Sequence, residues 1–222
     1  MNDLHPRRIV MLGGSFNPPT IAHFLLLQSA LDGAQADLGL YVPSCGPYVR
    51  KKMSMSDHPE EVFSDEDRLA MLRAMCESDS RMAVCEEEMS IQTPSSRSYR
   101  TMRDVQRQYP DPQPEVCFIF GADKLSDLPN WRSFPKMTRD FRLVIFHREG
   151  FDIEAAFTAD ERLAQRREAF IFLPQPGGME AVSSSAIRDA LRECRDPAAM
   201  MHPGAYRAMG AYEPYVPAEA AE

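Results

Sequence analysis

The residues from Gly13 to His23, Gly-Gly-Ser-Phe-Asn-Pro-Pro-Thr-Ile-Ala-His, have the composition of a phosphate-binding loop. They follow an apolar run, Ile9–Leu12, that is typical of a buried strand, and they precede an apolar segment, Phe24–Leu31, that is typical of a helix. In such an arrangement the helix N-terminus offers unpaired N–H groups and a partial positive charge to an anion. The imidazole of His23 can then donate to a phosphate oxygen that gains charge in a transition state. This segment therefore predicts a nucleotide-phosphate site.

A second group of hydrogen-bond donors lies in the segment Val182-Ser-Ser-Ser-Ala-Ile-Arg188. Ser183 is suited to cap the N-terminus of a helix, and Arg188 would lie about one turn into that helix. The free N–H groups, the hydroxyls and the guanidinium can face one phosphate, for which arginine offers a planar bidentate geometry. A capped helix with a surface arginine gives the same pattern, so the segment alone leaves both interpretations open.

Apolar runs alternate with helical segments along the chain, which predicts βαβ units and a mostly parallel sheet. The expected strands are Ile9–Leu12, Leu38–Val42, Met82–Cys85, Val116–Phe120, Leu143–Phe146 and Phe170–Leu173. The expected helices are Ile21–Leu31, Asp65–Glu77, Tyr99–Gln108, a short one after Asp123, Ile153–Arg167, one around Asp189–Arg192 and Ala198–Met209. We predict an α/β fold with a single Rossmann-like, doubly wound sheet and C-terminal helices. One domain is expected over residues 1–213, with the sheet core over about 7–175, a helical part over about 183–213 and a tail over 214–222.

The segment Pro43–Phe63 is polar and has little apolar periodicity, so we expect a long loop there. In α/β folds, a loop at the carboxyl end of a strand is where ligand contacts lie. The basic run Arg50-Lys-Lys52 falls in this loop. Lys51 and Lys52 either contact phosphates or form a solvated surface patch, and the sequence does not decide between the two.

Composition excludes several classes of function. The chain has 222 residues and a formal net charge of −8, which argues against nucleic-acid or anionic-membrane binding because both require surplus Lys and Arg. No run approaches the ~20 apolar residues of a membrane span, and we expect no secretory leader. The five cysteines are scattered without a Cys-x-x-Cys pair, which predicts reduced thiols in the cytoplasm and no zinc site. The expected partners are small molecules, and a homo-oligomer is left open.

The two donor segments together resemble the signatures of the HxGH nucleotidyltransferase superfamily. Its early signature, G-[ST]-[FG]-[DN]-P-x-[HT]-x-x-H, is matched by Gly14–His23, and its late one, I-S-S-[ST]-x-I-R, by Val182–Arg188. Within that superfamily, the stretches between them resemble nicotinate/nicotinamide mononucleotide adenylyltransferases. These stretches are Asp67–Leu72, Phe120–Leu125 followed by Trp131, and Phe146–Gly150. The likeness covers about Arg8 to Tyr212, and the first signature histidine is Thr20 in this chain, as in eukaryote-like members.

The resemblance implies transfer of the adenylyl group of ATP to nicotinate or nicotinamide mononucleotide, with release of pyrophosphate, in NAD biosynthesis. The nucleophile is already an anion, so such an enzyme needs no general base; it aligns two anions and stabilises the charge that develops. It also implies Mg²⁺ bound mainly through the phosphates of ATP, as this ion prefers, without metal ligands from the chain.

The resemblance further implies roles for individual residues. The implied catalytic residues are His23, Thr20 and Arg188. The implied ATP-binding residues are Gly14, Ser15, Phe16, His23, Lys51, Lys52, Gly121, Asp123, Ser183, Ser185 and Arg188. The implied mononucleotide-binding residues are Ser15, Phe16, Asn17, Arg97, Ser98, Tyr99, Trp131 and Arg148. Trp131 would stack on the pyridinium ring, with core packing as the alternative, and Asp123 would accept from ribose hydroxyls, with helix capping as the alternative.

Two other functions remain as alternatives. Phosphopantetheine adenylyltransferase shares both signatures, but it is typically shorter and lacks the segment around Trp131. A catalytically silent nucleotide-binding or sensing module is suggested by Thr20, whose side chain carries no charge. A cytidylyltransferase is disfavoured because the late R-T-x-G-[IV]-S-[ST] pattern is absent from the sequence.

Overall fold

The computed structural model describes residues 5–92, 98–110, 112–179 and 181–210. The chain divides into two compact units, each made of several segments. Unit 1 contains residues 1–13, 26–41 and 97–177, and unit 2 contains residues 14–25, 42–96 and 178–222. The expectation of one domain over 1–213 therefore stays a prediction, and each unit is described by itself.

Six strands form one sheet in the order β3-β2-β1-β4-β5-β6. They are β1 (Arg8–Gly14), β2 (Leu38–Pro43), β3 (Met82–Val84), β4 (Glu115–Gly121), β5 (Arg142–Phe146) and β6 (Phe170–Leu173). The pairs β1–β4, β4–β5 and β5–β6 are parallel, with Ile9 opposite Val116 and Phe118 opposite Leu143. This order is that of a doubly wound Rossmann sheet, which confirms the predicted fold class. The strand order reverses between β1 and β4, and ligands of such sheets bind outside the carboxyl ends of the strands.

Burial on both faces explains why the central strands of unit 1 were recognisable. Val10, Val116, Cys117, Leu143 and Val144 have no exposed surface, although neighbouring side chains along a strand point to opposite faces. Strands covered by helices on both sides must be apolar at every position, so their sequences lack alternation.

The helices of unit 1 differ from the prediction at α5 (Phe134–Asp140), which was not expected, and within the segment Ile153–Arg167. They include α4 (Ser98–Arg107), η1 (Ala122–Lys124), η2 (Leu128–Asn130), α5 (Phe134–Asp140), α6 (Ile153–Ala159), α7 (Glu161–Ala164) and η3 (Arg167–Ala169). The helix expected over Ile153–Arg167 is interrupted at Asp160, whose backbone is extended (φ −132°, ψ 111°). The Asp160 carboxylate accepts from the Arg162 N–H at 2.8 Å, so it caps a new helix there instead of continuing the first.

Unit 2 contains a helix where a loop was expected. Helix α2 (Gly46–Met53) occupies part of the Pro43–Phe63 segment, so the prediction of a continuous loop is wrong. Pro47 stands in its first turn, where a missing N–H costs nothing. Val49 and Met53, one turn apart, are buried and anchor one face.

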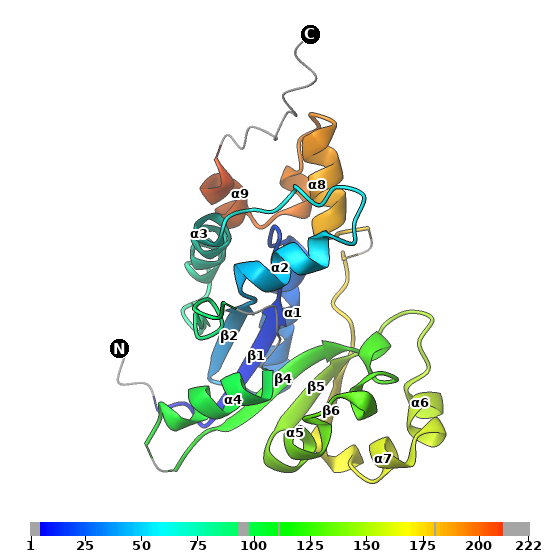
Figure 1. The fold of residues 1–222 in the computed structure, drawn as a ribbon. Helices are drawn as coiled ribbons and strands as arrows, with labels where there is room; N and C mark the ends of the chain where they lie inside the picture. Colours follow the sequence, from blue (N-terminus) through cyan, green and yellow to red (C-terminus); the bar gives the residue numbers. More distant parts are fainter. Residues whose placement is uncertain (1–4, 93–97, 111, 180, 211–222) are drawn as a thin grey trace. The chain divides into compact units, whose positions relative to one another are not determined.

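The remaining helices of unit 2 are α3 (Asp65–Cys76), α8 (Ser184–Arg192), η4 (Ala198–Met200) and α9 (Pro203–Met209). The single helix expected over Ala198–Met209 is broken because His202 caps α9, its Nδ1 accepting from the Gly204 N–H at 3.1 Å. Helices α3 and α9 lie side by side (Figure 1). A Cβ on Gly204 would come within 2.4 Å of the Ala74 carbonyl oxygen, so this close contact requires glycine.

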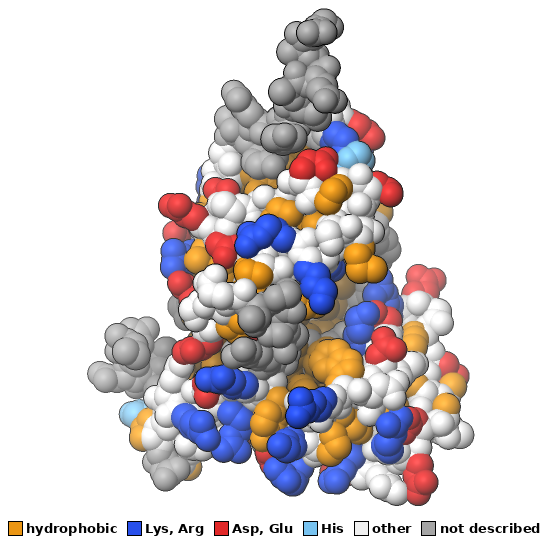
Figure 2. Space-filling model, in the orientation of Figure 1, with side chains coloured by type: hydrophobic (Ala, Val, Ile, Leu, Met, Phe, Trp, Pro, Cys, Tyr) orange, Lys and Arg blue, Asp and Glu red, His pale blue; other side chains and the backbone are white. Residues whose placement is uncertain are grey.

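Helix α1 (Ile21–Gly33) begins in unit 2 and continues into unit 1. No helix within the described ranges is long and apolar enough to cross a membrane. On the face shown in Figure 2, Lys and Arg side chains gather in the part of unit 1 that carries α4 and α5. Several of them are paired with acids: Arg103 and Arg139 with Asp140, and Arg107 with Asp104. This surface is therefore mixed in charge rather than uniformly basic.

Candidate active site

The loop that follows β1 holds an aromatic side chain in an unusual backbone conformation. Phe16 has φ 45°, in the left-handed region that a bulky residue seldom adopts. Its ring is 1% exposed and lies edge-on to the His23 imidazole, with 4.9 Å between ring centroids. Such strain costs on the order of 1–3 kcal/mol and is concentrated at functional loops.

Thr20 determines how the His23 imidazole carries its proton. The Thr20 backbone N–H donates to His23 Nδ1 at 2.9 Å, and the Thr20 Oγ1 lies 2.9 Å from the same nitrogen. Thr20 Oγ1 also accepts from the His23 N–H at 3.3 Å, which caps the start of α1. Because Nδ1 accepts, the proton of the neutral ring is on Nε2, which is the nitrogen left to donate. Thr20 is 1% exposed, so its hydroxyl contacts His23 rather than solvent.

The His23 ring is neutral at physiological pH. Burial, together with the positive charge of Lys52, lowers the pKa of His23 from 6.5 to about 4. Lys52 is therefore close enough to act on the ring, and it stands on the last turn of α2. Lys51 is also exposed on α2. The site thus presents a neutral imidazole donor beside a cationic ammonium group.

This lowered pKa predicts a defined pH dependence of stability. The unfolded chain binds a proton on His23 below pH 6.5, whereas the folded chain does so only below about pH 4. The free energy of unfolding should therefore fall as pH decreases from 6.5 to 4, and His23→Gln should reduce that slope. Urea unfolding of both proteins between pH 4 and 8 measures it. Equal slopes for the two proteins would contradict a His23 that is neutral in the folded chain.

A fully buried arginine holds the segment from the end of β1 to the start of α1, residues 13–23, which we call the opening loop. The Arg68 side chain, on α3, has no exposed surface. Its Nη1 donates to the Ser15 carbonyl at 2.7 Å, and its Nη2 donates to the Ser44 carbonyl at 2.9 Å and to Asp65 Oδ1 at 2.7 Å. The Ser44 N–H in turn donates to the Gly14 carbonyl at 2.9 Å. Arg68 therefore ties together the segments that follow β1 and β2.

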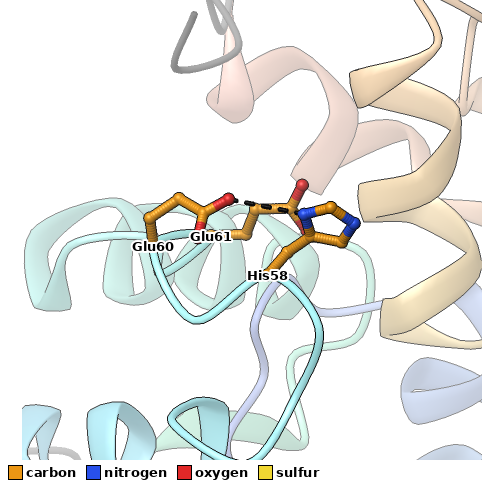
Figure 3. A group of neighbouring side chains, drawn as sticks. All are labelled: His58, Glu60 and Glu61. Carbon is orange, nitrogen blue, oxygen red and sulfur yellow. Dashed lines mark ion pairs between the residues drawn. The ribbon is translucent and has the colours of Figure 1, made fainter. Parts of the chain in front are cut away.

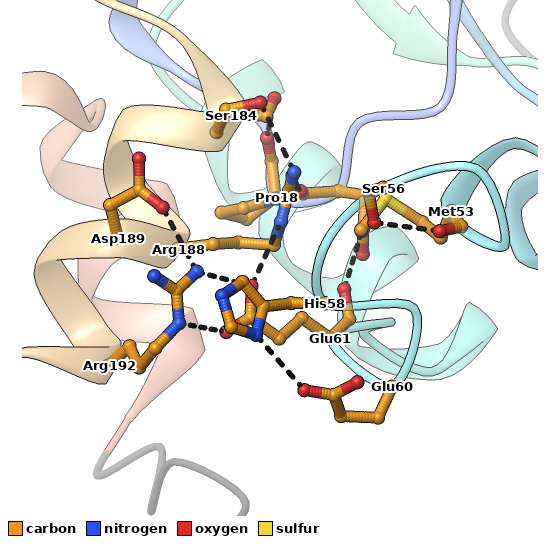
Figure 4. A network of polar contacts seen from close by, with 12 residues as sticks. Pro18, Met53, Ser56, His58, Glu60, Glu61, Ser184, Arg188, Asp189 and Arg192 are labelled. Carbon is orange, nitrogen blue, oxygen red and sulfur yellow. Dashed lines mark hydrogen bonds and ion pairs between the residues drawn. The ribbon is translucent and has the colours of Figure 1, made fainter.

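Helix α8 brings the late signature against the early one, within unit 2. Ser183 caps the helix, its Oγ accepting from the Ala186 N–H at 3.0 Å, as predicted. Ser184 Oγ donates to the Pro18 carbonyl at 2.7 Å (Figure 4). Arg188 Nη1 donates to the Asn17 carbonyl at 2.7 Å, and its Nη2 donates to Ser185 Oγ at 3.2 Å. Ser184 was not among the predicted site residues, although its run of hydroxyls was.

Unit 1 carries a separate group of predicted site residues around the carboxyl end of β4. Asp123 lies 3.1 Å from both Lys124 Nζ and Arg148 Nη1. Burial opposes ionisation of Asp123, but hydrogen bonds and charge from Lys124 and Arg148 prevail and lower its pKa. A Cβ on Gly121 would lie 2.4 Å from Asp123 Oδ1, so the carboxylate folds back over Gly121 in this conformation.

The predicted ring-binding residues are also placed in unit 1. Trp131 is partly exposed and meets Phe120 edge to face, with 5.4 Å between ring centroids. The Tyr99 hydroxyl donates to Asp140 at 2.7 Å, and Ser98 begins α4. Arg97 lies outside the described residues. Trp131 thus packs against Phe120 while part of its surface is exposed.

Three side chains of the segment after α2 have metal-ligand chemistry. The ligand atoms of His58, Glu60 and Glu61 all lie within 4.8 Å of one another (Figure 3). Glu61, however, also pairs with Arg188 at 3.5 Å and with Arg192 at 2.8 Å. Because two guanidinium groups already compensate this carboxylate and would repel a cation, we assign no metal to the cluster.

Comparison with known proteins identifies the family. A model described as cytidylyltransferase-like matches residues 11–190. The chain belongs to the cytidylyltransferase-like family. A protein from Shouchella clausii named probable nicotinate-nucleotide adenylyltransferase is 31% identical over 144 residues, 65% of this chain and 70% of the relative. A protein of the same name from Halalkalibacterium halodurans is 29% identical over 188 residues, 84% and 81% of the two chains. The resemblance inferred from the motifs is confirmed.

Solved structures with this fold include a nicotinic acid mononucleotide adenylyltransferase. The Plasmodium falciparum enzyme complexed with NaAD has a TM-score of 0.65 and 18% identity, and covers 91% of this chain and 94% of its own. The same enzyme complexed with APC gives a TM-score of 0.64 at 20% identity, with the same coverage. At these identities the likeness shows the fold of this cytidylyltransferase-like chain.

Proposed function

We propose that this chain transfers the adenylyl group of ATP to nicotinate mononucleotide, yielding nicotinate adenine dinucleotide and pyrophosphate in NAD biosynthesis. The observation that carries the proposal is the contact between the two signature segments, through Arg188 to the Asn17 carbonyl and Ser184 to the Pro18 carbonyl. Through this contact, His23 and the guanidinium of Arg188 both belong to unit 2. The names of the curated relatives support adenylyl transfer to this mononucleotide.

In the proposed reaction a phosphate oxygen of the mononucleotide attacks the α-phosphorus of ATP. One O–P bond forms, the bond from the α-phosphorus to the bridging oxygen breaks, and pyrophosphate leaves with the electron pair. No proton needs to be removed from the nucleophile, so the protein acts by alignment and charge stabilisation. His23 Nε2–H donates to a phosphate oxygen, and Arg188 and Lys52 supply positive charge. We propose that Thr20 acts through His23 as a positioning residue.

The donor set also indicates how Mg²⁺ takes part. His23, Lys52 and Arg188 are hydrogen-bond donors or cations, which suits phosphate oxygens and does not suit a divalent metal ion. We therefore propose that Mg²⁺ is held by the phosphates of ATP, where it neutralises part of their charge. The protein residues then bind the phosphate oxygens that the ion leaves free.

Unit 1 supplies the proposed contacts to sugar and ring. Asp123 is ionised and suited to accept from ribose hydroxyls. Trp131 offers a partly open indole face to a cationic pyridinium. We propose a cytoplasmic location, which five free thiols support because structural disulfides belong to oxidising compartments.

A direct assay tests the function. The purified chain is incubated with ATP, Mg²⁺ and either nicotinate or nicotinamide mononucleotide, and pyrophosphate and dinucleotide are measured. We expect dinucleotide from nicotinate mononucleotide. Turnover with phosphopantetheine alone would select the sister enzyme, and ATP binding without any turnover would select a silent nucleotide-binding module.

Trp131→Ala is expected to weaken mononucleotide binding by ~1–2 kcal/mol, in the range of a partly desolvated cation–π or stacking contact. The KM for the mononucleotide should rise while the KM for ATP stays unchanged. Trp131→Phe is the matched control, since it keeps an aromatic face and should lose less. A selective rise in the KM for ATP would place Trp131 in the other subsite.

A further inference from the structure

The carboxylate of Glu61 lies between two arginines of helix α8 (Figure 4). Arg192 contacts it with two nitrogens, Nε to Oε1 at 2.8 Å and Nη2 to Oε2 at 3.1 Å. Arg188, one turn earlier, places its Nε 3.5 Å from Oε2. The Glu61 side chain is only 17% exposed, so both ion pairs are shielded from solvent more than surface pairs are.

The backbone around Glu61 is fastened to the opening loop by a single side chain. Asn17 Nδ2 donates to the Glu61 carbonyl at 2.8 Å, and Asn17 Oδ1 accepts from the Phe63 N–H at 2.8 Å. Asn17 is 2% exposed, and its own carbonyl accepts from Arg188 Nη1. Asn17, Glu61 and Arg188 therefore form a closed ring of contacts that joins the loop, the segment before α3 and helix α8.

This ring orients the guanidinium of Arg188 before any ligand arrives. The Arg188 side chain is 11% exposed, and its Nε is buried with no hydrogen-bond partner among the described residues. One edge of the planar group is thus held by the Asn17 carbonyl and another by the charge of Glu61. A guanidinium held in this way costs no reorganisation when a transition state develops charge, which is the condition for effective electrostatic stabilisation.

We propose that Glu61 is a positioning residue for adenylyl transfer: it holds the guanidinium of Arg188 toward the reacting phosphate. Arg192 in turn keeps the Glu61 carboxylate in place. The inference rests on the proposed function, because it needs Arg188 to contact phosphate. Glu61 has two opposing effects. Its negative charge disfavours a nearby triphosphate, whereas its grip on Arg188 favours the transition state. Removing the charge should therefore lower kcat, expressed per folded molecule, without raising the KM for ATP.

A double-mutant cycle tests this coupling. Glu61→Gln keeps the side-chain shape and should lower kcat ~10-fold in the wild-type background, the scale of a modest misplacement of a catalytic group. In the Arg188→Lys background the same change should lower kcat less than about two-fold, because groups that act as one unit are not additive. Glu66→Gln, on the exposed face of nearby α3, is the matched control and should leave kcat and both KM values unchanged.

The outcomes separate the inference from the function on which it rests. If wild-type protein makes no dinucleotide, the proposed function fails. If wild-type protein is active and the effects of Glu61→Gln and Arg188→Lys on kcat add, or Glu61→Gln raises the KM for ATP alone, the inference is overturned. Should Glu61→Gln not fold, as judged by its melting temperature, Arg192→Gln replaces it in the cycle. We expect Arg192→Gln to lower kcat by a smaller factor, and this effect should also depend on Arg188. If the effects of Arg192→Gln and Arg188→Lys on kcat add, the proposal is overturned.

Discussion

Replacing His23 with alanine is expected to lower kcat at least ~10²-fold, the scale on which one preorganised donor stabilises an oxyanion. The neutral ring, with its pKa lowered to about 4, keeps a proton on Nε2 because the Thr20 N–H donates to Nδ1. Alanine removes that donor and leaves the phosphate charge unmatched in the transition state. Steady-state assays with saturating ATP and nicotinate mononucleotide measure the change.

His202→Ala is the matched control for the loss of a histidine ring. His202 is 7% exposed, caps α9 through Nδ1 and lies 4.5 Å from Phe24, centroid to centroid. We place it outside the phosphate-binding set, so its loss should lower the melting temperature but leave kcat per folded molecule within a few-fold. If His23→Ala behaves like His202→Ala, His23 has a structural role only.

Elements built from apolar runs could be predicted from the sequence, whereas elements set by one polar side chain could not. All six strands were predicted, and β1, β2, β4 and β5 were recognisable because a strand buried on both faces is apolar throughout. The short strands β3 and β6 are less buried and were recognisable only as brief apolar runs. Helix α2 was not predicted because only Gly46, Val49 and Met53 of its eight residues are buried, and three basic residues interrupt the apolar pattern. The break at Asp160 depends on whether its carboxylate caps a new helix or stays in solvent, and periodicity does not distinguish these.

The same difference applies to the candidate site. The His23 and Arg188 signatures were recognisable because each is a local pattern with the spacing of a capped helix. The partners that hold Arg188 were not, because they are distant in sequence: Asn17, whose carbonyl accepts from Arg188, is 171 residues away. The hydrogen-bond partner of Thr20 was also not predictable, since the spacing of three residues to His23 is equally consistent with a hydroxyl aimed at phosphate. The structure places the Thr20 N–H and Oγ1 2.9 Å from His23 Nδ1.

The second large effect is expected from Arg68→Met, which should lower the free energy of unfolding by about 3 kcal/mol. Methionine fills most of the volume but donates to none of the three oxygens, and it leaves the Ser15 and Ser44 carbonyls without their arginine donor. The remaining partner, Asp65, is 42% exposed and can be rehydrated, which keeps the loss at the lower end of the range for a broken buried ion pair. Urea unfolding at pH 7 measures it as a lower midpoint with an unchanged slope.

Arg73→Met, on the same helix, provides the control for Arg68→Met. The Arg73 side chain is 59% exposed and its ion pair to Glu86 is at the surface, so its replacement should change the unfolding free energy by less than about 0.5 kcal/mol. A loss below about 1 kcal/mol for Arg68→Met would mean that water replaces the guanidinium at both carbonyls. In that case the opening loop would be held by Asn17 and helix α8 rather than by the buried arginine behind it. Comparison of the two variants therefore shows whether Arg68, or Asn17 together with helix α8, fixes the conformation of the opening loop that carries His23.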